Sequence, residues 1–156
     1  MSLLHIDTLD LSFAKTPILR GVTLGLEPGE ILGLVGESGS GKSMTALAVM
    51  GLLPQGARAT GRIWLDGQDL LALSERQMCA LRGNQIGMIF QEPMTALNPL
   101  MRVGDQLAET LMVHRKMPRA EARAIARAKL DRVGLPGPRF PLSLYPHELS
   151  GGQRQR

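Results

Sequence analysis

Apolar and polar residues alternate along two stretches near the N-terminus. The alternation is loose from Leu4 to Phe13 and strict from Gly21 to Leu26. A period of two residues is typical of strands in a sheet that has one exposed face. We therefore predict two strands of a half-exposed antiparallel sheet, followed by a turn at Glu27-Pro28-Gly29-Glu30.

Two short runs are apolar without alternation, Ile31 to Val35 and Ile86 to Phe90. Continuous apolar runs of this length predict strands of a parallel sheet that are buried on both faces. Between them, Gly61 to Leu65 and the following Asp66-Gly67 predict a strand that ends in a turn.

Helical spacing of apolar residues predicts four helices. One follows residue 43, one covers Glu75 to Leu81 with Ser74 as its N-cap, and two more cover residues 104–114 and 118–133. The last has an apolar face and a separate basic stripe of Arg119, Arg123 and Arg127. The stripe fits a solvated face, and a nucleic-acid contact is the alternative interpretation.

Composition limits the class of protein. The chain has 156 residues, of which 44% are hydrophobic, so it can form one domain with a buried core. No apolar run approaches the roughly 20 residues that cross a bilayer. A single cysteine, Cys79, excludes an internal disulfide, and a net charge of +4 is only mildly basic. Aromatic residues make up 3% of the chain, which argues against recognition of single-stranded nucleic acid by base stacking.

One segment after the first apolar run fits the pattern Gly-x-x-x-x-Gly-Lys-Ser, in which glycines let backbone N–H groups approach a phosphate. Its residues are Gly36, Glu37, Ser38, Gly39, Ser40, Gly41, Lys42 and Ser43. We predict that this phosphate loop binds a nucleoside triphosphate at the positive end of the following helix. Lys42 would reach the β- and γ-phosphates, and the Ser43 hydroxyl would ligate Mg²⁺. A glycine-rich turn without a ligand is the alternative.

Three further parts of the chain are candidates for contacts with a nucleotide or its metal ion. Gln91 follows the second apolar run, where a polar side chain could ligate Mg²⁺ or orient a water molecule. Phe13 could stack on a base, or it could be ordinary strand core. Ser150 predicts the start of a helix, and the glycines that follow it, Gly151 and Gly152, leave backbone N–H groups uncovered before Gln153. This segment could be a second anion site, and a capped surface helix is the alternative.

These segments together resemble the Walker A loop, the Q-loop and the signature motif of ABC transporter nucleotide-binding subunits. The exact sequence of Gly36 to Ser43 is similar to the dipeptide, oligopeptide and nickel import branch, as are three further segments: Phe90-Gln91-Glu92-Pro93-Met94, Leu97-Asn98-Pro99 and Tyr145-Pro146-His147. The resemblance implies an α/β fold, a P-loop NTPase core with an antiparallel β subdomain and a helical subdomain. Residues 1–90 would form the β subdomain and P-loop core, 91–148 the Q-loop and helical subdomain, and 149–156 the signature motif.

The resemblance also implies a function as the ATP-binding subunit of an importer for peptides or a related solute. Two subunits, identical or different, would pair head to tail, so that ATP and Mg²⁺ on Lys42 and Ser43 of one subunit are covered by Ser150 to Gln153 of the other. Two transmembrane permease subunits would be further partners, and a solute-binding protein an indirect one, on the cytoplasmic side of the inner membrane. No nucleic-acid partner is expected. Phe13 stands where the family usually has tyrosine, and it would stack on the adenine.

The chain departs from the family by ending at Arg156, within the helix that the signature opens. The family's Walker B aspartate, its catalytic glutamate and its switch histidine follow that helix. We therefore expect a fragment that is incomplete at the C-terminus and has negligible ATPase activity by itself. A nucleotide-binding fragment without hydrolysis, or an ABC-type ATPase of DNA repair or translation, are the alternatives.

Overall fold

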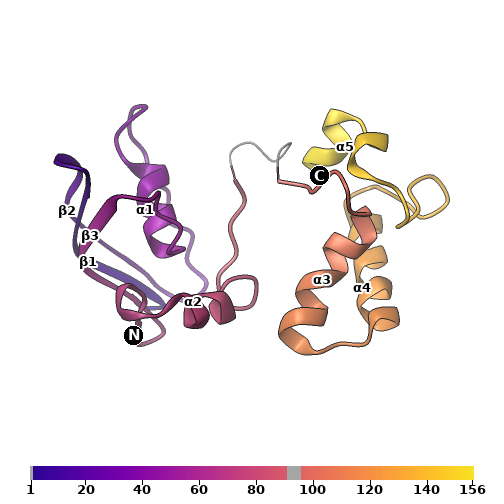
Figure 1. Cartoon of the computed structure of the whole chain (residues 1–156), viewed down its shortest axis with the longest axis horizontal. Coiled ribbons are helices and arrows are strands. Elements are labelled where there is room, and N and C mark those ends of the chain that lie inside the picture. The colour runs from indigo at the N-terminus through magenta and orange to yellow at the C-terminus, as the bar shows by residue number, and fades with distance from the viewer. Residues whose placement is uncertain (1, 91–95) are drawn as a thin grey trace. The chain divides into compact units, whose positions relative to one another are not determined.

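The computed structural model describes residues 2–90 and 96–156. The chain divides into two compact units, Met1–Arg82 and Gly83–Arg156. Figure 1 shows strands and two α-helices in the first unit and helices in the second. The mixture of α and β elements agrees with the α/β class that the sequence predicts.

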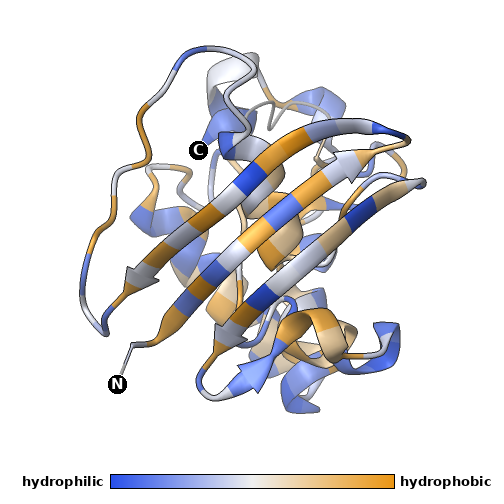
Figure 2. Ribbon diagram, turned by 90° about the vertical axis from the view of Figure 1, so that its left-hand side faces the viewer, coloured by the Kyte–Doolittle hydropathy of each residue, from blue (hydrophilic) through white to orange (hydrophobic). Residues whose placement is uncertain are grey.

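The first unit contains a four-stranded antiparallel sheet in the order β2-β1-β3-β4. Its strands are β1 (Leu4–Phe13), β2 (Thr16–Leu26), β3 (Ala57–Leu65) and β4 (Gln68–Asp69). The predicted antiparallel pair is confirmed, with β2 beginning earlier than its alternation indicates. Figure 2 shows apolar and polar positions alternating along the three long strands.

The loose alternation in β1 has a structural cause. Thr8 has a positive φ of 49°, and the pairing register of β1 shifts between Ile6 and Leu9. This irregularity lets Ile6, Leu9 and Leu11 all reach the core, although they are not evenly spaced. Gly61 of β3 lies against it, since an added Cβ would come within 2.4 Å of the Thr8 carbonyl oxygen.

Two α-helices, α1 (Lys42–Val49) and α2 (Glu75–Leu81), lie on the same side of this sheet (Figure 1). They contribute Ala48, Met78 and Leu81 to the buried apolar residues of the first unit. The predicted cap of α2 is confirmed, because the Ser74 N–H donates to the Gln77 side chain at 2.9 Å.

The start of α1 is fitted closely to the sheet. Gly41 precedes the helix with φ +91°, a conformation that L side chains rarely adopt. A Cβ on Gly41 would lie 2.2 Å from Cδ2 of Leu19 in β2. The phosphate loop can therefore enter the helix at this point only because residue 41 has no side chain.

The prediction of two buried parallel strands is wrong for this structure. Ile31 and Val35 are 97% and 99% exposed, and Ile89 is 94% exposed. A strand needs a neighbour to pair its backbone N–H and C=O groups. Among the described residues neither run forms a strand: Ile31 to Val35 is irregular, and the second run makes only an isolated bridge, at Ile86. Apolar composition predicts a buried strand, but it does not show whether a neighbouring strand is present to pair with it.

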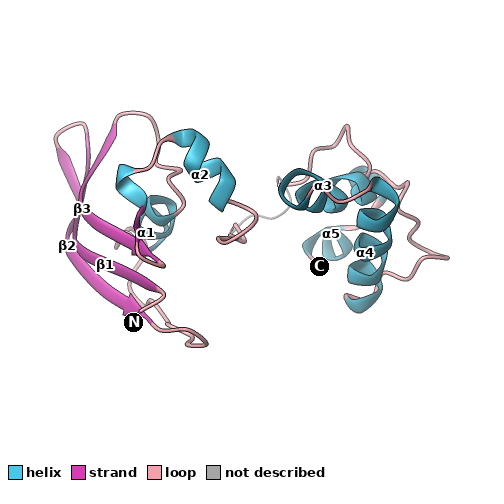
Figure 3. Ribbon diagram, turned by 90° about the horizontal axis from the view of Figure 1, so that it is seen from below, coloured by secondary structure: helices cyan, strands magenta, loops and turns pink. Residues whose placement is uncertain are grey.

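The second unit consists of helices and loops in its described part (Figure 3). Its helices are α3 (Val103–Arg115), α4 (Arg119–Arg132), the 3₁₀ turn η3 (Pro146–Glu148) and α5 (Gly151–Gln155). The helices predicted here are confirmed. The apolar face of α4 buries Ala122, Ala126 and Leu130, whereas Val133, the C-cap of the helix, is 38% exposed.

The basic stripe of α4 is bound within the unit. Arg119 and Arg123 both pair with the Asp105 carboxylate of α3. Arg127 donates to the carbonyl oxygens of Phe140 and Leu135. The interpretation of the stripe as a solvated face is therefore wrong for Arg123 and Arg127, because their guanidinium groups join α4 to α3 and to the following loop.

We expect Asp105→Asn to lower the free energy of unfolding by about 1 kcal/mol at pH 7, because an amide cannot form either ion pair. Desolvation raises the pKa of Asp105, but the hydrogen bonds and charges of Arg119 and Arg123 outweigh it and bring the pKa below its usual value. A depressed pKa stabilises the fold above the unfolded value of about 3.9 and loses this effect as pH falls through the folded value. The difference between the two proteins should thus be constant from about pH 7 to 5 and shrink below about pH 4.

Urea denaturation at several pH values measures this difference. Glu109→Gln is the matched control, since Glu109 is exposed on the same helix and has no ion pair among the described residues. An equal loss of stability in both variants, or a difference that persists at pH 2, would contradict the assignment.

A strained backbone conformation alone costs about 1 to 3 kcal/mol. Gly41→Ala should lower the stability of the first unit by more than this, because the new Cβ also collides with Leu19. Gly29→Ala is the control: Gly29 has a similar φ of +80° and open space around it. Thermal unfolding of the two variants separates collision from backbone strain. Equal shifts in Tm would show that the Leu19 contact is unimportant.

Candidate functional site

The phosphate loop forms a compact turn ahead of α1. Ser40 donates its N–H to the Glu37 carbonyl oxygen at 3.2 Å, and Gly39 adopts a positive φ of 84°. An added Cβ on Gly36 would lie 2.7 Å from Ser40 Oγ. Glycine at these positions thus allows the backbone to fold back on itself, as the sequence pattern predicts.

Lys42 directs its ammonium group into this turn. Its Nζ donates to the carbonyl oxygens of Gly36 and Glu37, each at 2.7 Å, and to Ser40 Oγ at 3.2 Å. These bonds hold a positive charge at the centre of the loop, beside the start of a helix. Both the charge and the helix dipole attract an anion to the same place.

Several backbone N–H groups of the phosphate loop are available to bind a ligand. Within the part of the chain that the structure describes, the N–H groups of Gly39, Gly41 and Ser43 donate to no protein acceptor. Ser43 is exposed, while Thr45 is buried and bonds its hydroxyl to the Gly41 carbonyl at 3.1 Å. Bare N–H groups, one ammonium group and a free hydroxyl fit a triphosphate with its Mg²⁺ ion.

Protein side chains alone do not make a metal site here. Among the described residues, no group of three or more histidine, cysteine, aspartate or glutamate side chains is suited to hold an ion. A hydroxyl such as that of Ser43 supplies one oxygen ligand, and Mg²⁺ commonly takes its others from phosphates and water. Gln91, the second predicted metal ligand and the predicted catalytic residue, lies outside the described residues.

Phe13 lies at the end of β1, opposite Thr16 in β2 and Ala57 in β3. Its side chain is 45% exposed. A ring buried in a strand core would be covered, so this exposure argues against the strand-core interpretation, and stacking on a base stays a prediction. Leu11, two positions before Phe13 in β1, pairs with Leu19 of β2. Leu19 is the residue against which Gly41 packs.

The predicted signature segment forms the start of α5 in the second unit. The Ser150 N–H donates to Gln153 Oε1 at 2.8 Å, and Ser150 Oγ accepts from the Gln153 N–H at 3.4 Å. This reciprocal capping box confirms the predicted N-cap. Gly151 and Gly152 are exposed, and a Cβ on Gly152 would meet nothing within 4 Å.

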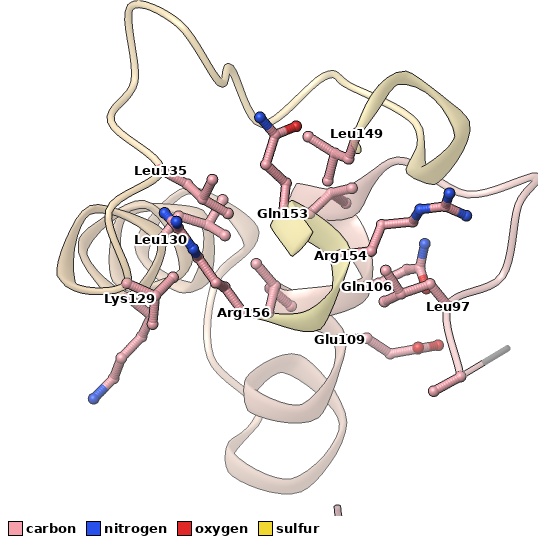
Figure 4. Close-up of a pocket in the computed structure, with 14 residues that line it drawn as sticks. Leu97, Gln106, Glu109, Lys129, Leu130, Leu135, Leu149, Gln153, Arg154 and Arg156 are labelled. Atoms are coloured by element: carbon pink, nitrogen blue, oxygen red, sulfur yellow. The ribbon is translucent and has the colours of Figure 1, made fainter. Parts of the chain in front are cut away.

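A pocket of about 440 Å³ lies between α3, α4 and α5 (Figure 4). Leu130, Leu135 and Leu149 give it apolar walls, and Gln153 and Arg154 reach its edge. The pocket is within the second unit, and Gln153 of the signature segment both caps α5 and borders this pocket.

Two residues that contact α1 or its ends were missed by sequence reasoning. Thr45 has a local signal, since a threonine in a helix often bonds the carbonyl four residues before it. Arg82 has none: its guanidinium donates to the carbonyl oxygens of Met50 and Gly51, which are 32 and 31 residues away in the chain.

Comparison with known proteins agrees with this geometry. Residues 19–156 match the family model described as ABC transporter. The oligopeptide transport ATP-binding protein OppD of Salmonella typhimurium is 49% identical over 159 residues, which cover 99% of this chain and 47% of that protein. The dipeptide transport ATP-binding protein DppD of Bacillus subtilis is 47% identical, covering 98% of this chain and 48% of that protein. The chain thus spans about half the length of the curated relatives it matches.

Solved structures show the same fold. The ATP-binding cassette MJ0796, in a dimeric post-hydrolysis state bound to ADP and Pi, aligns with a TM-score of 0.80 and 26% identity, over 97% of this chain and 65% of that one. A second dimeric structure of MJ0796, described as a bacterial ABC transporter cassette, aligns with a TM-score of 0.81. Since the family model covers most of the chain and the fold agrees, the chain belongs to the ABC transporter family.

Proposed function

We propose that this protein is the ATP-binding subunit of an ABC importer that couples ATP binding and hydrolysis to the uptake of peptides. The observation that carries the proposal is the Lys42 ammonium group inside a glycine loop at the start of α1. The relatives named above, OppD and DppD, support the peptide class, because their names describe oligopeptide and dipeptide transport.

In this proposal the residues of the phosphate loop hold the triphosphate. Lys42 exchanges its bonds to Gly36 and Glu37 for bonds to phosphate oxygens, and the free N–H groups of the loop add further donors. Ser43 contributes its hydroxyl to Mg²⁺, which neutralises the charge that develops on the phosphates. Gln91 ligates Mg²⁺ or orients the attacking water. Phe13 stacks on the adenine ring.

The signature segment serves a partner subunit in this proposal. Ser150, Gly151, Gly152 and Gln153 of one subunit cover the nucleotide that is held by the phosphate loop of the other. The exposure of both glycines supports this role, since their backbone is accessible to a ligand. The dimeric structures described for MJ0796 also support a paired arrangement, with an identical or a different second subunit.

Transport requires membrane partners, and we propose two permease subunits, with a solute-binding protein acting through them. Among the described residues no helix is both long and apolar enough to cross a bilayer. A peripheral position on the cytoplasmic face of the inner membrane would let the subunit use cellular ATP and drive the permeases. Peptide binding would lie on those partners.

Lys42→Ala should lower the affinity for ATP by at least about tenfold, because each lost charge-assisted hydrogen bond is worth about 1.5 to 3 kcal/mol. A fluorescent ATP analogue measures binding, and a phosphate-release assay on the assembled transporter measures hydrolysis. Both should fall together. The matched control is Lys116→Asn: Lys116 is exposed and has a φ of 54°, which asparagine tolerates. Unchanged ATP binding in Lys42→Ala would refute the proposed function.

Phe13→Ala should weaken ATP binding by about fivefold to 100-fold, because stacking on a base is worth about 1 to 3 kcal/mol. Phe13→Tyr should retain the affinity, since the aromatic face remains. Tripolyphosphate, which has no base, should bind equally well to all three proteins. If Phe13→Ala weakens ATP and tripolyphosphate by the same factor, Phe13 acts through the strand core and not through adenine.

A further inference from the structure

Arg82, the residue that follows α2, reaches the far end of α1. Its Nε donates to the Met50 carbonyl oxygen at 2.8 Å, and its Nη2 donates to the Gly51 carbonyl oxygen at 2.9 Å. Its side chain is only 17% exposed. A planar guanidinium that binds two successive carbonyls fixes both the position and the direction of the backbone it contacts.

Glu75 holds this guanidinium in its orientation. Arg82 Nη1 lies 2.5 Å from Glu75 Oε1, and Arg82 Nη2 lies 3.2 Å from Glu75 Oε2, so the pair has two parallel bonds. Cys79 donates its thiol to the same Oε1 at 3.4 Å. The hydrogen bond from Arg82 is the largest of several effects that lower the pKa of the Glu75 carboxyl, which agrees with a charged pair.

The end of α1 is closely packed around this contact. Met50 is the C-cap of the helix and is buried, and Gly51 has a φ of +61°. A Cβ on Gly51 would lie 3.1 Å from Arg82 Nη2 and 3.2 Å from Met78 Cε. The last carbonyl groups of a helix have no hydrogen-bond partners within it. A cation at that end also interacts favourably with the negative end of the helix dipole. Arg82 meets both needs with one side chain.

The other end of α1 is the phosphate loop. The helix has 8 residues, so Lys42 and the Arg82 contact are separated by little more than two turns. A helix this short is marginal in water without tertiary support. Movement at its C-terminal end would therefore be transmitted to the N–H groups and the ammonium that face a phosphate.

We propose that Arg82, oriented by Glu75, is a positioning residue for phosphate binding: it fixes the C-terminal end of α1 and so keeps Lys42 and the loop N–H groups in place. This inference rests on the proposed function of the phosphate loop. Arg82 itself touches no phosphate, and it acts only through the helix.

The test is the affinity of the protein for tripolyphosphate, which reports on the phosphate loop without a base. Arg82→Gln should weaken it by about threefold or more, and Arg82→Lys, which keeps the charge but not the fork, should weaken it less. Arg76→Gln is the matched control, because Arg76 is exposed on α2 and its side chain makes no hydrogen bond or ion pair with the described residues. Circular dichroism establishes that each variant is folded at the temperature of the measurement.

A double-mutant cycle separates positioning from a general loss of stability. Lys42 and Arg82 do not touch, so their effects on stability should add. Their effects on tripolyphosphate affinity should not add: once Lys42→Ala has removed the ammonium, Arg82→Gln should cost clearly less than it does in the wild type. Fully additive losses of affinity would overturn the inference.

Glu75→Gln provides an independent variant in case Arg82→Gln does not fold, since the Glu75 side chain is 72% exposed. It should weaken tripolyphosphate binding by about twofold and add nothing when Arg82→Gln is already present. Unchanged affinity in both Glu75→Gln and Arg82→Gln, with normal dependence on Lys42, would overturn this inference alone. Loss of the Lys42 dependence would overturn the proposed function and this inference with it.

Discussion

The short helix α1 packs closely against its neighbours at each end. At its start, Gly41 fits against Leu19 of the sheet, and at its end Gly51 fits against Arg82 and Met78. Steric fit in a close-packed interior is strict, because neighbouring atoms cannot move far. The position of the phosphate loop in the first unit follows from these two contacts, and the chemistry of Lys42 depends on that position.

Features set by neighbours in the sequence could be predicted. The cap at Ser74 and the apolar face of α4 each arise from residues within a few positions of one another, and β1 and β2 are strands that follow one another directly in the chain. The capping box of Ser150 and Gln153 belongs to the same group. For the site, the pattern from Gly36 to Ser43 identified the loop, and the inward direction of the Lys42 ammonium agrees with it. Binding of a nucleotide there stays a prediction.

Features set by distant residues could not be predicted. Ile31 to Val35 has the composition of a buried strand, but composition does not say whether a partner strand lies beside it. Arg82 contacts backbone carbonyls about thirty positions earlier, and no pattern near Arg82 indicates this. Arg123 and Arg127 look like a solvated stripe because helical spacing reveals which residues share a face, but not what that face meets.

The exposure of Ile31 and Val35 has a consequence for how the molecule behaves in concentrated solution. Each is almost wholly accessible, and they lie in one irregular segment directly before the phosphate loop. Unpaired backbone groups flanked by branched apolar side chains are ready to add to the edge of another chain. We therefore expect copies of this chain to associate through that segment at high concentration.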